Sequence, residues 1–197
     1  MFTSEDSGKL QRMQHLKDRL DACTLCSLSG SRTRAVVGSG SLDASVVLVG
    51  EAPGRKEDET GLPFVGSAGK LLDRLLAEAG LSREDVFITN IVKCRPPRNR
   101  RPKKAEVEQC ESYLHEQLSI IRPRVVAPMG NSPLAYFQGR YGLPGEAIGN
   151  VHGKAFTVNE SWGEVTLMPL YHPAAAIYNR RLLEELKRDM KRLAGLL

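Results

Sequence analysis

Residues 45–54, SVVLVGEAPG, decide the fold. The apolar run at 46–49 is short and rich in valine, which predicts a strand buried on both faces over residues 45–50. The turn that follows is rich in glycine and proline, so its backbone N–H groups can face a ligand. It is not a phosphate-binding loop, because the pattern G-x-x-x-x-G-K-[ST] is absent. Taken alone, an ordinary strand-to-loop turn explains these residues better than a binding site does.

The rest of the chain alternates between strands of this kind and helices. Apolar segments predict further strands at residues 86–92, 125–128 and 165–170. Helical spacing and capping signals predict helices at residues 9–22, 67–79, 103–121 and 181–193, and one more that begins at Asn131. This alternation predicts an α/β fold whose mostly parallel sheet is covered by helices on both faces.

Composition and charge narrow the class of protein. The chain has 197 residues, of which 41% are hydrophobic and 26% are charged, so wholesale disorder, collagen and coiled coil are excluded. We expect one domain over residues 1–197, in which residues 1–22 form an N-terminal helix. No apolar run is long enough to span a membrane and no secretory signal is visible, so we expect a cytoplasmic protein. The net charge of +5 permits an acidic partner such as nucleic acid without requiring one.

Chemically versatile side chains stand where three of the predicted strands end. Glu51, Asn90 and His172 occupy these positions. The carboxyl ends of parallel strands meet at one edge of a sheet, so we expect a single cleft there. Histidine suits proton transfer or hydrogen bonding to a developing anion, and a buried amide suits a flat base. A structural histidine and a structural asparagine remain the alternatives.

Two loops could contribute further ligand contacts. Phe64 lies in the loop GLPFVG, where an aromatic ring could stack on a planar ligand or merely anchor the loop. Residues 95–104, RPPRNRRPKK, hold six basic residues and no acid, and their prolines exclude a helix. This basic loop is a candidate phosphate clamp through Arg98, Arg100 and Arg101, with a solvated loop as the alternative.

Four cysteines complete the set of chemical residues. They are Cys23 and Cys26, in a C-x2-C hook, followed by Cys94 and Cys110. In a reducing compartment such a set indicates a metal site more than disulfides. Two local and two distant ligands suit a [4Fe–4S] cluster or a structural zinc ion. Four unrelated buried cysteines, or a redox C-x-x-C, are the alternatives.

Together these residues resemble the family 4 uracil-DNA glycosylases, the iron–sulfur branch of that superfamily. The resemblance runs from Cys23 to about Arg180 and is specific because the motifs occur together in order. They are the C-x2-C hook, GEAPG at 50–54, GLPFVG at 61–66, TNIVKCRPP at 89–97, Cys110 and YHPAA at 171–175.

The resemblance implies a fold, a cofactor and an activity. It implies a three-layer α/β/α domain with a four-stranded parallel central sheet, and a structural [4Fe–4S] cluster held by Cys23, Cys26, Cys94 and Cys110. It implies that uracil is flipped from single- or double-stranded DNA and excised, leaving an abasic site for base excision repair. We expect a monofunctional enzyme that works as a monomer.

The resemblance also assigns roles to individual residues. Phe64 would stack on uracil, Asn90 would read its amide edge and backbone groups of Gly50, Glu51 and Ala52 would contact the ring. A neutral His172 would stabilise the uracil anion at O2, and Ile177 or Tyr178 would fill the vacated base stack. The best-known uracil-DNA glycosylases place a water-orienting aspartate where this chain has Ala52, so Glu51 would position the water or brace the loop.

Two other functions remain open at this point. A covalent uracil-trapping relative keeps the fold, but it uses a histidine in the basic loop, and none occurs between Arg95 and Gln109. A non-catalytic nucleic-acid-binding domain with structural zinc would need neither His172 nor Asn90.

Overall fold

The computed structural model describes residues 4–197, and residues 1–3 of the predicted N-terminal segment lie outside this range. Within these residues the strands form one mixed sheet in the order β1-β3-β2-β4-β6-β5. The strands are β1 (Ser39–Gly40), β2 (Val46–Gly50), β3 (Val86–Asn90), β4 (Val125–Pro128), β5 (Phe156–Glu160) and β6 (Gly163–Leu167). The helices are α1 (Ser4–Asp21), α2 (Arg55–Thr60), α3 (Ser67–Glu78), α4 (Lys104–Ile121), α5 (Asn131–Tyr141), α6 (Ile148–Val151), α7 (Pro173–Ala176) and α8 (Arg180–Ala194). None of the helices in this range is long and apolar enough to cross a membrane.

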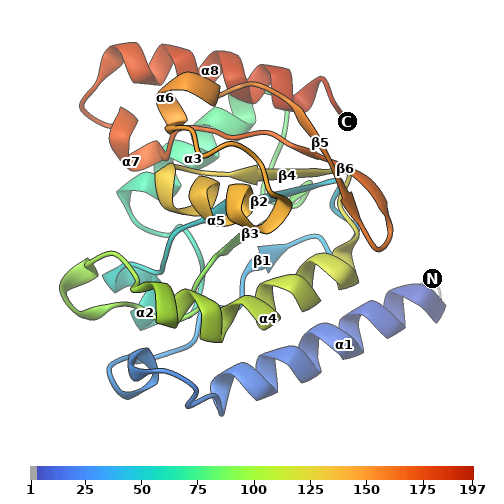
Figure 1. The fold of residues 1–197 in the computed structure, drawn as a ribbon, viewed down its shortest axis with the longest axis vertical. Coiled ribbons are helices and arrows are strands. Elements are labelled where there is room, and N and C mark those ends of the chain that lie inside the picture. The colour runs from blue at the N-terminus through green and yellow to red at the C-terminus, as the bar shows by residue number, and fades with distance from the viewer. Residues whose placement is uncertain (1–3) are drawn as a thin grey trace.

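The three-layer arrangement follows from the alternation of side chains along β2. Val47 and Val49 pack into a core with residues of α1, α4 and α5, while Val46 and Leu48 pack into a second core with residues of α3 and α8. Figure 1 shows α1 and α4 together on one side of the sheet and α3, α7 and α8 on the other. A strand that is apolar at every position therefore has a helical layer on each face.

The sheet differs from the expected four-stranded parallel sheet because one antiparallel strand is added at each edge. Strands β3, β2, β4 and β6 are parallel to one another. The two-residue strand β1 adds to β3 and the hairpin partner β5 adds to β6, both antiparallel, so the described sheet has six strands. Strand β1 is too short, and β5 too polar and exposed, to give an apolar pattern in the sequence.

Other boundaries differ slightly from the predicted ones. The segment 51–63 contains helix α2, and β3 ends at Asn90 because the chain then turns toward Cys94. Strand β6 ends at Leu167, but a single bridge between Met129 and Leu170 keeps the chain beside β4 up to His172.

The parallel register sets the strand ends beside one another. Gly50, the last residue of β2, pairs with Asn90, the last residue of β3. An added Cβ at Gly50 would lie 2.3 Å from Oδ1 of Asn90 and 2.8 Å from the Phe64 ring. Glycine is therefore needed at this strand end, because any side chain would displace the two residues that meet there.

We predict that Leu48→Ala lowers the free energy of unfolding by about 2–5 kcal/mol, because its side chain is fully buried and would leave a cavity. The matched control Leu10→Ala removes the same atoms from a residue that is 62% exposed and should change stability by under about 0.5 kcal/mol. Denaturant unfolding of both variants checks this. Equal losses would contradict a two-sided core around β2.

Candidate active site

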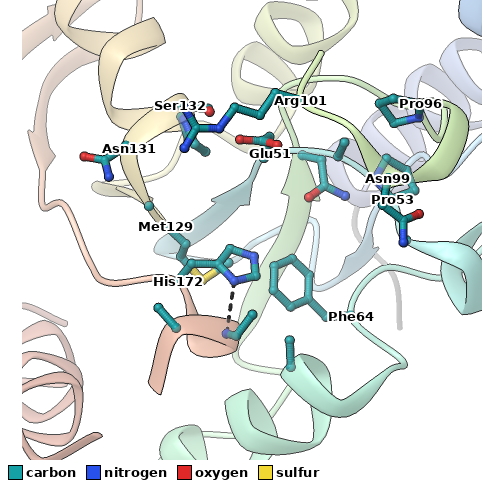
Figure 2. Close-up of a pocket in the computed structure, with 18 of the residues that line it drawn as sticks. Glu51, Pro53, Phe64, Pro96, Asn99, Arg101, Met129, Asn131, Ser132 and His172 are labelled. Carbon is teal, nitrogen blue, oxygen red and sulfur yellow. Dashed lines mark hydrogen bonds between the residues drawn. The ribbon is translucent and has the colours of Figure 1, made fainter. Parts of the chain in front are cut away.

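A cleft of about 510 Å³ opens at the carboxyl edge of the parallel strands. Its walls come from segments far apart in the sequence: the turn after β2, the loop before α3, the end of β3, the basic loop, the start of α5 and residues 171–175. Figure 2 shows His172 and Phe64 facing each other across it, with Glu51 above them in this view. The volume is in the range of pockets that hold a small planar ligand.

The imidazole of His172 is held in one tautomer. The backbone N–H of Ala174 donates a hydrogen bond of 3.1 Å to Nδ1 of His172 (Figure 2). An Nδ1 that accepts carries no proton, so the neutral ring carries its proton on Nε2. The side chain thus offers an N–H donor from Nε2.

The surroundings of His172 favour the neutral ring. Burial lowers the pKa of His172 to about 4, and the Glu57 carboxylate acts weakly in the opposite direction. Near neutral pH the residue is therefore a hydrogen-bond donor without charge.

Phe64 is held in an unusual backbone conformation. Its φ of 52° lies in the left-handed region, which non-glycine residues rarely adopt. Arg83 donates to the carbonyl oxygens of both Pro63 and Phe64, the first at 3.0 Å, and pairs with Asp73 at 2.6 Å. The Phe64 ring lies 5.5 Å from the His172 ring, at an angle of 30°. These contacts fix one wall of the cleft.

Asn90 presents an unsatisfied amide to the cleft. The residue is 2% exposed, its side chain forms no hydrogen bond in the described part of the chain, and its polar atoms stay open to the cleft, because no fully buried side-chain N or O atom there lacks a partner. Buried amides are normally paired, so this one is available to a ligand. Its carbonyl oxygen and NH₂ group offer an acceptor and a donor.

The carboxylates of Glu51, Glu57 and Asp58 differ in their hydrogen-bond partners. Glu57 accepts hydrogen bonds of 2.9 Å from the backbone N–H groups of Val65 and Gly66, and so braces the Phe64 loop. Asp58 is buried and accepts from the backbone N–H of Thr33 at 2.9 Å. Among the described residues, nothing donates to the carboxylate of Glu51, which lines the cleft. Glu51 is thus the carboxylate free to act on water or ligand.

The basic loop is held in place by an ion pair between Arg100 and Glu106. Its guanidinium donates to both oxygens of Glu106, at 2.8 and 2.6 Å, and this pair lowers the pKa of Glu106 to about 2. Arg101 instead extends over the cleft toward Ser132 (Figure 2). Arg98 is exposed outside the cleft and has a φ of 55°.

Ile177 and Tyr178, the two residues expected to fill the vacated base stack, differ in their exposure to solvent. Tyr178 is 98% exposed, whereas Ile177 is half-buried and packs against the core shared by α3 and α8. Tyr178 is therefore the freer of the two to enter a base stack.

The four cysteines lie near one another, since Cys23 and Cys26 act on the charge of Cys94, and Cys26 and Cys94 act on that of Cys110. All four belong to or pack against one hydrophobic core, and none forms a disulfide. Arg32 donates to Sγ of Cys94 at 3.1 Å, and the backbone N–H of Lys93 donates to Sγ of Cys110 at 3.4 Å. Burial raises the pKa of Cys110 to about 11. Within residues 4–197, no three His, Cys, Asp or Glu side chains are grouped to hold a single metal ion.

Several residues of the cleft were not predicted from the sequence. They are Glu57, Asn99 and the segment from Met129 to Pro133 at the end of β4. The sequence could have indicated the end of β4, because a predicted strand ends there and is followed by a glycine and the start of a helix. The backbone contacts of Glu57 carry no local sequence signal, since they depend on a loop eight residues away.

Comparisons with known proteins agree on one family. A model described as the uracil DNA glycosylase superfamily matches residues 37–194. The chain is 44% identical over 188 residues to the Type-4 uracil-DNA glycosylase of Archaeoglobus fulgidus, covering 95% of this chain and 94% of that protein. It is 45% identical over 186 residues to that of Saccharolobus solfataricus, with 92% and 86% covered. It is 41% identical over 188 residues to that of Sulfurisphaera tokodaii, with 95% and 86% covered.

We predict that the His172 imidazole titrates near pH 4 and is protonated on Nε2 above that pH. Between pH 6.5 and about pH 4, His172 binds a proton in the unfolded chain but not in the folded chain. The contribution of His172 therefore lowers the free energy of unfolding as the pH falls through this window. Nitrogen NMR of histidine-labelled protein measures the pKa and tautomer. A titration near 6.5, or a proton on Nδ1, would contradict the assignment.

Proposed function

Since this chain belongs to the uracil DNA glycosylase superfamily and excises uracil from DNA, we propose that excision takes place in the cleft between Phe64, Asn90 and His172. The observation that carries this assignment is the neutral Nε2–H donor of His172, which faces an aromatic ring and shares the cleft with an unpaired amide. A flat pyrimidine with a carbonyl next to its glycosidic nitrogen needs this combination.

The cleft can recognise uracil by its shape and its hydrogen-bonding edge. A base flipped out of DNA would stack on Phe64. The Asn90 amide would donate to O4 and accept from N3–H. Cytosine carries an amine in place of O4 and no proton on N3, so the NH₂ group of the amide would face a donor and its oxygen would face an acceptor. Gly50 leaves the space that this pairing requires.

His172 then stabilises the leaving group. When the bond between C1′ and N1 breaks, its electron pair stays with the base and charge gathers on O2. A fixed neutral donor at this position stabilises the anion without having to reorganise during the reaction. The hydrogen bond from Ala174 keeps the Nε2 proton in place.

Glu51 acts on the other partner in the reaction, the water. The sugar left behind resembles an oxocarbenium ion, and water must add to C1′ and lose a proton. Glu51 is the free carboxylate of the cleft, whereas Glu57 is engaged in holding the loop. We assign Glu51 to orienting this water and to stabilising the positive sugar.

DNA binding uses the rim of the same cleft. Arg101 and Arg98 are exposed and contact phosphates, whereas Arg100 shapes the loop through its pair with Glu106. Tyr178 fills the gap left by the flipped base, because it is almost fully exposed and lies three residues after Ala175, which lines the cleft.

The cysteine site fits a [4Fe–4S] cluster held by Cys23, Cys26, Cys94 and Cys110. The support is that the four sulfurs act electrostatically on one another and that two N–H groups are directed at sulfur, since thiolate ligands accept such hydrogen bonds. A bound cluster would serve as a structural cross-link between three distant segments. Ser27, next to the hook, also donates to Glu106 at 3.0 Å, which connects the site to the basic loop.

We predict that His172→Gln and Glu51→Gln each slow single-turnover release of uracil from a uracil-containing oligonucleotide by roughly 10²–10³-fold. His15→Gln and Glu59→Gln, at exposed positions away from the cleft wall, serve as matched controls and should react at the rate of the unmodified chain. Full activity in both cleft variants would refute the site. A denaturant-resistant protein–DNA adduct would refute hydrolytic turnover.

For Tyr178→Ala we expect excision from duplex DNA to slow by roughly 10-fold, with little change on single-stranded DNA. A single strand has no base stack to refill after flipping, so the wedge matters only in the duplex. Parallel rate measurements on both substrates check this. Equal losses on the two substrates would assign Tyr178 to general DNA contact instead.

For the cysteine site we expect anaerobically purified protein to be brown and to hold about four iron atoms per chain. Cys94→Ser should lose the colour and iron, whereas Thr24→Ala, an exposed change inside the hook, should keep both. Iron and sulfide analysis with visible absorbance measures the difference. Colourless protein that contains zinc would contradict the cluster and would indicate a structural zinc ion instead.

A further inference from the structure

Lys93 is a fully buried lysine whose presence the proposed reaction does not explain. Its exposed fraction is 0%. Its Nζ donates to Oγ1 of Thr89 at 2.7 Å, to the carbonyl oxygen of Asn90 at 2.8 Å and to Oε1 of Gln117 at 2.5 Å. An ammonium group has three N–H donors, so these three acceptors use all of them.

No carboxylate pairs with this ammonium within the described residues, and the groups that favour its charge are the sulfurs of Cys110 and Cys94. Burying an ammonium is unfavourable even beside these sulfurs, and an apolar side chain of similar length would fill the same space at lower cost. Packing alone therefore does not account for a lysine here. The three acceptors show instead what the group holds in place.

The acceptors belong to one network that surrounds the end of β3. Oγ1 of Thr89 and Nε2 of Gln117 both donate to the carbonyl oxygen of Val37, at 2.9 and 2.6 Å. The backbone of Lys93 is fixed as well, because its carbonyl oxygen accepts from Val36 at 2.8 Å and its N–H donates to Cys110. Lys93 thus joins β3, α4 and the segment before β1.

The side-chain amide of Asn90 depends on this network for its position. It forms no hydrogen bond of its own in the described chain and lines the cleft, so the backbone of Asn90 and the packing around it determine where the amide points. Lys93 holds that backbone directly, through the carbonyl oxygen of Asn90.

We propose that Lys93 is a positioning residue for uracil recognition, which acts by fixing the carbonyl of Asn90 and through it the amide that reads the base. The inference rests on the proposed function of the cleft. It assigns Lys93 to the specificity of the enzyme rather than to its stability.

A double-mutant cycle separates these roles. Lys93→Met keeps an unbranched side chain but removes every donor. As the single change we expect it to slow single-turnover uracil release by roughly 10-fold, because the amide is then misplaced. In an Asn90→Ala background we expect it to slow release by less than about 2-fold, since the amide it positions is then absent. The affinity for free uracil, measured by calorimetry, should follow the same pattern. Lys154→Met, an exposed change, should alter neither quantity.

Thermal unfolding and iron content of each variant show whether it is folded and loaded. If Lys93→Met does not unfold cooperatively, the cycle is run with Lys93→Gln, which keeps a donor. Equal losses in both backgrounds, or no loss in either, would overturn the inference while leaving the proposed function intact. An unmodified chain that released no uracil would overturn both.

Discussion

The parallel pairing of β2 with β3 is the constraint on which the site depends. It sets Gly50 beside Asn90, and the parallel pairs of β2 with β4 and of β4 with β6 bring the segments after those strands to the same edge. Every residue assigned to uracil follows one of these strand ends or packs against one. A shift of register by one residue would turn Asn90 out of the cleft and put a side chain where Gly50 now leaves space.

Around this edge, backbone hydrogen bonds supply the rigidity that the chemistry needs. Ala174 fixes the tautomer of His172, Glu57 and Arg83 fix the loop of Phe64, and Lys93 fixes the carbonyl of Asn90. The groups that would touch uracil are then free to bind it, since their supports are separate residues. A preorganised site of this kind stabilises the transition state without a further cost of ordering.

The sequence predicted the parts of this design that are local. The valine-rich run of β2 and the strand ends at Asn90 and His172 carry their own signals, and the predicted cleft follows from them. The supports could not be predicted, because Glu57, Arg83 and Lys93 act through contacts that only the folded chain creates. The pair of Arg100 with Glu106 could not be predicted either, because it joins the basic loop to α4 only in the folded chain. The edge strands β1 and β5 were not predicted from the sequence, because neither is an apolar run.

A crystal structure of the protein with uracil tests the central claim most directly. The account predicts the base stacked on Phe64, with O2 within hydrogen-bond distance of Nε2 of His172 and the N3–O4 edge on the Asn90 amide. Uracil bound elsewhere on the molecule, or bound in the cleft with O2 turned away from His172, would contradict it.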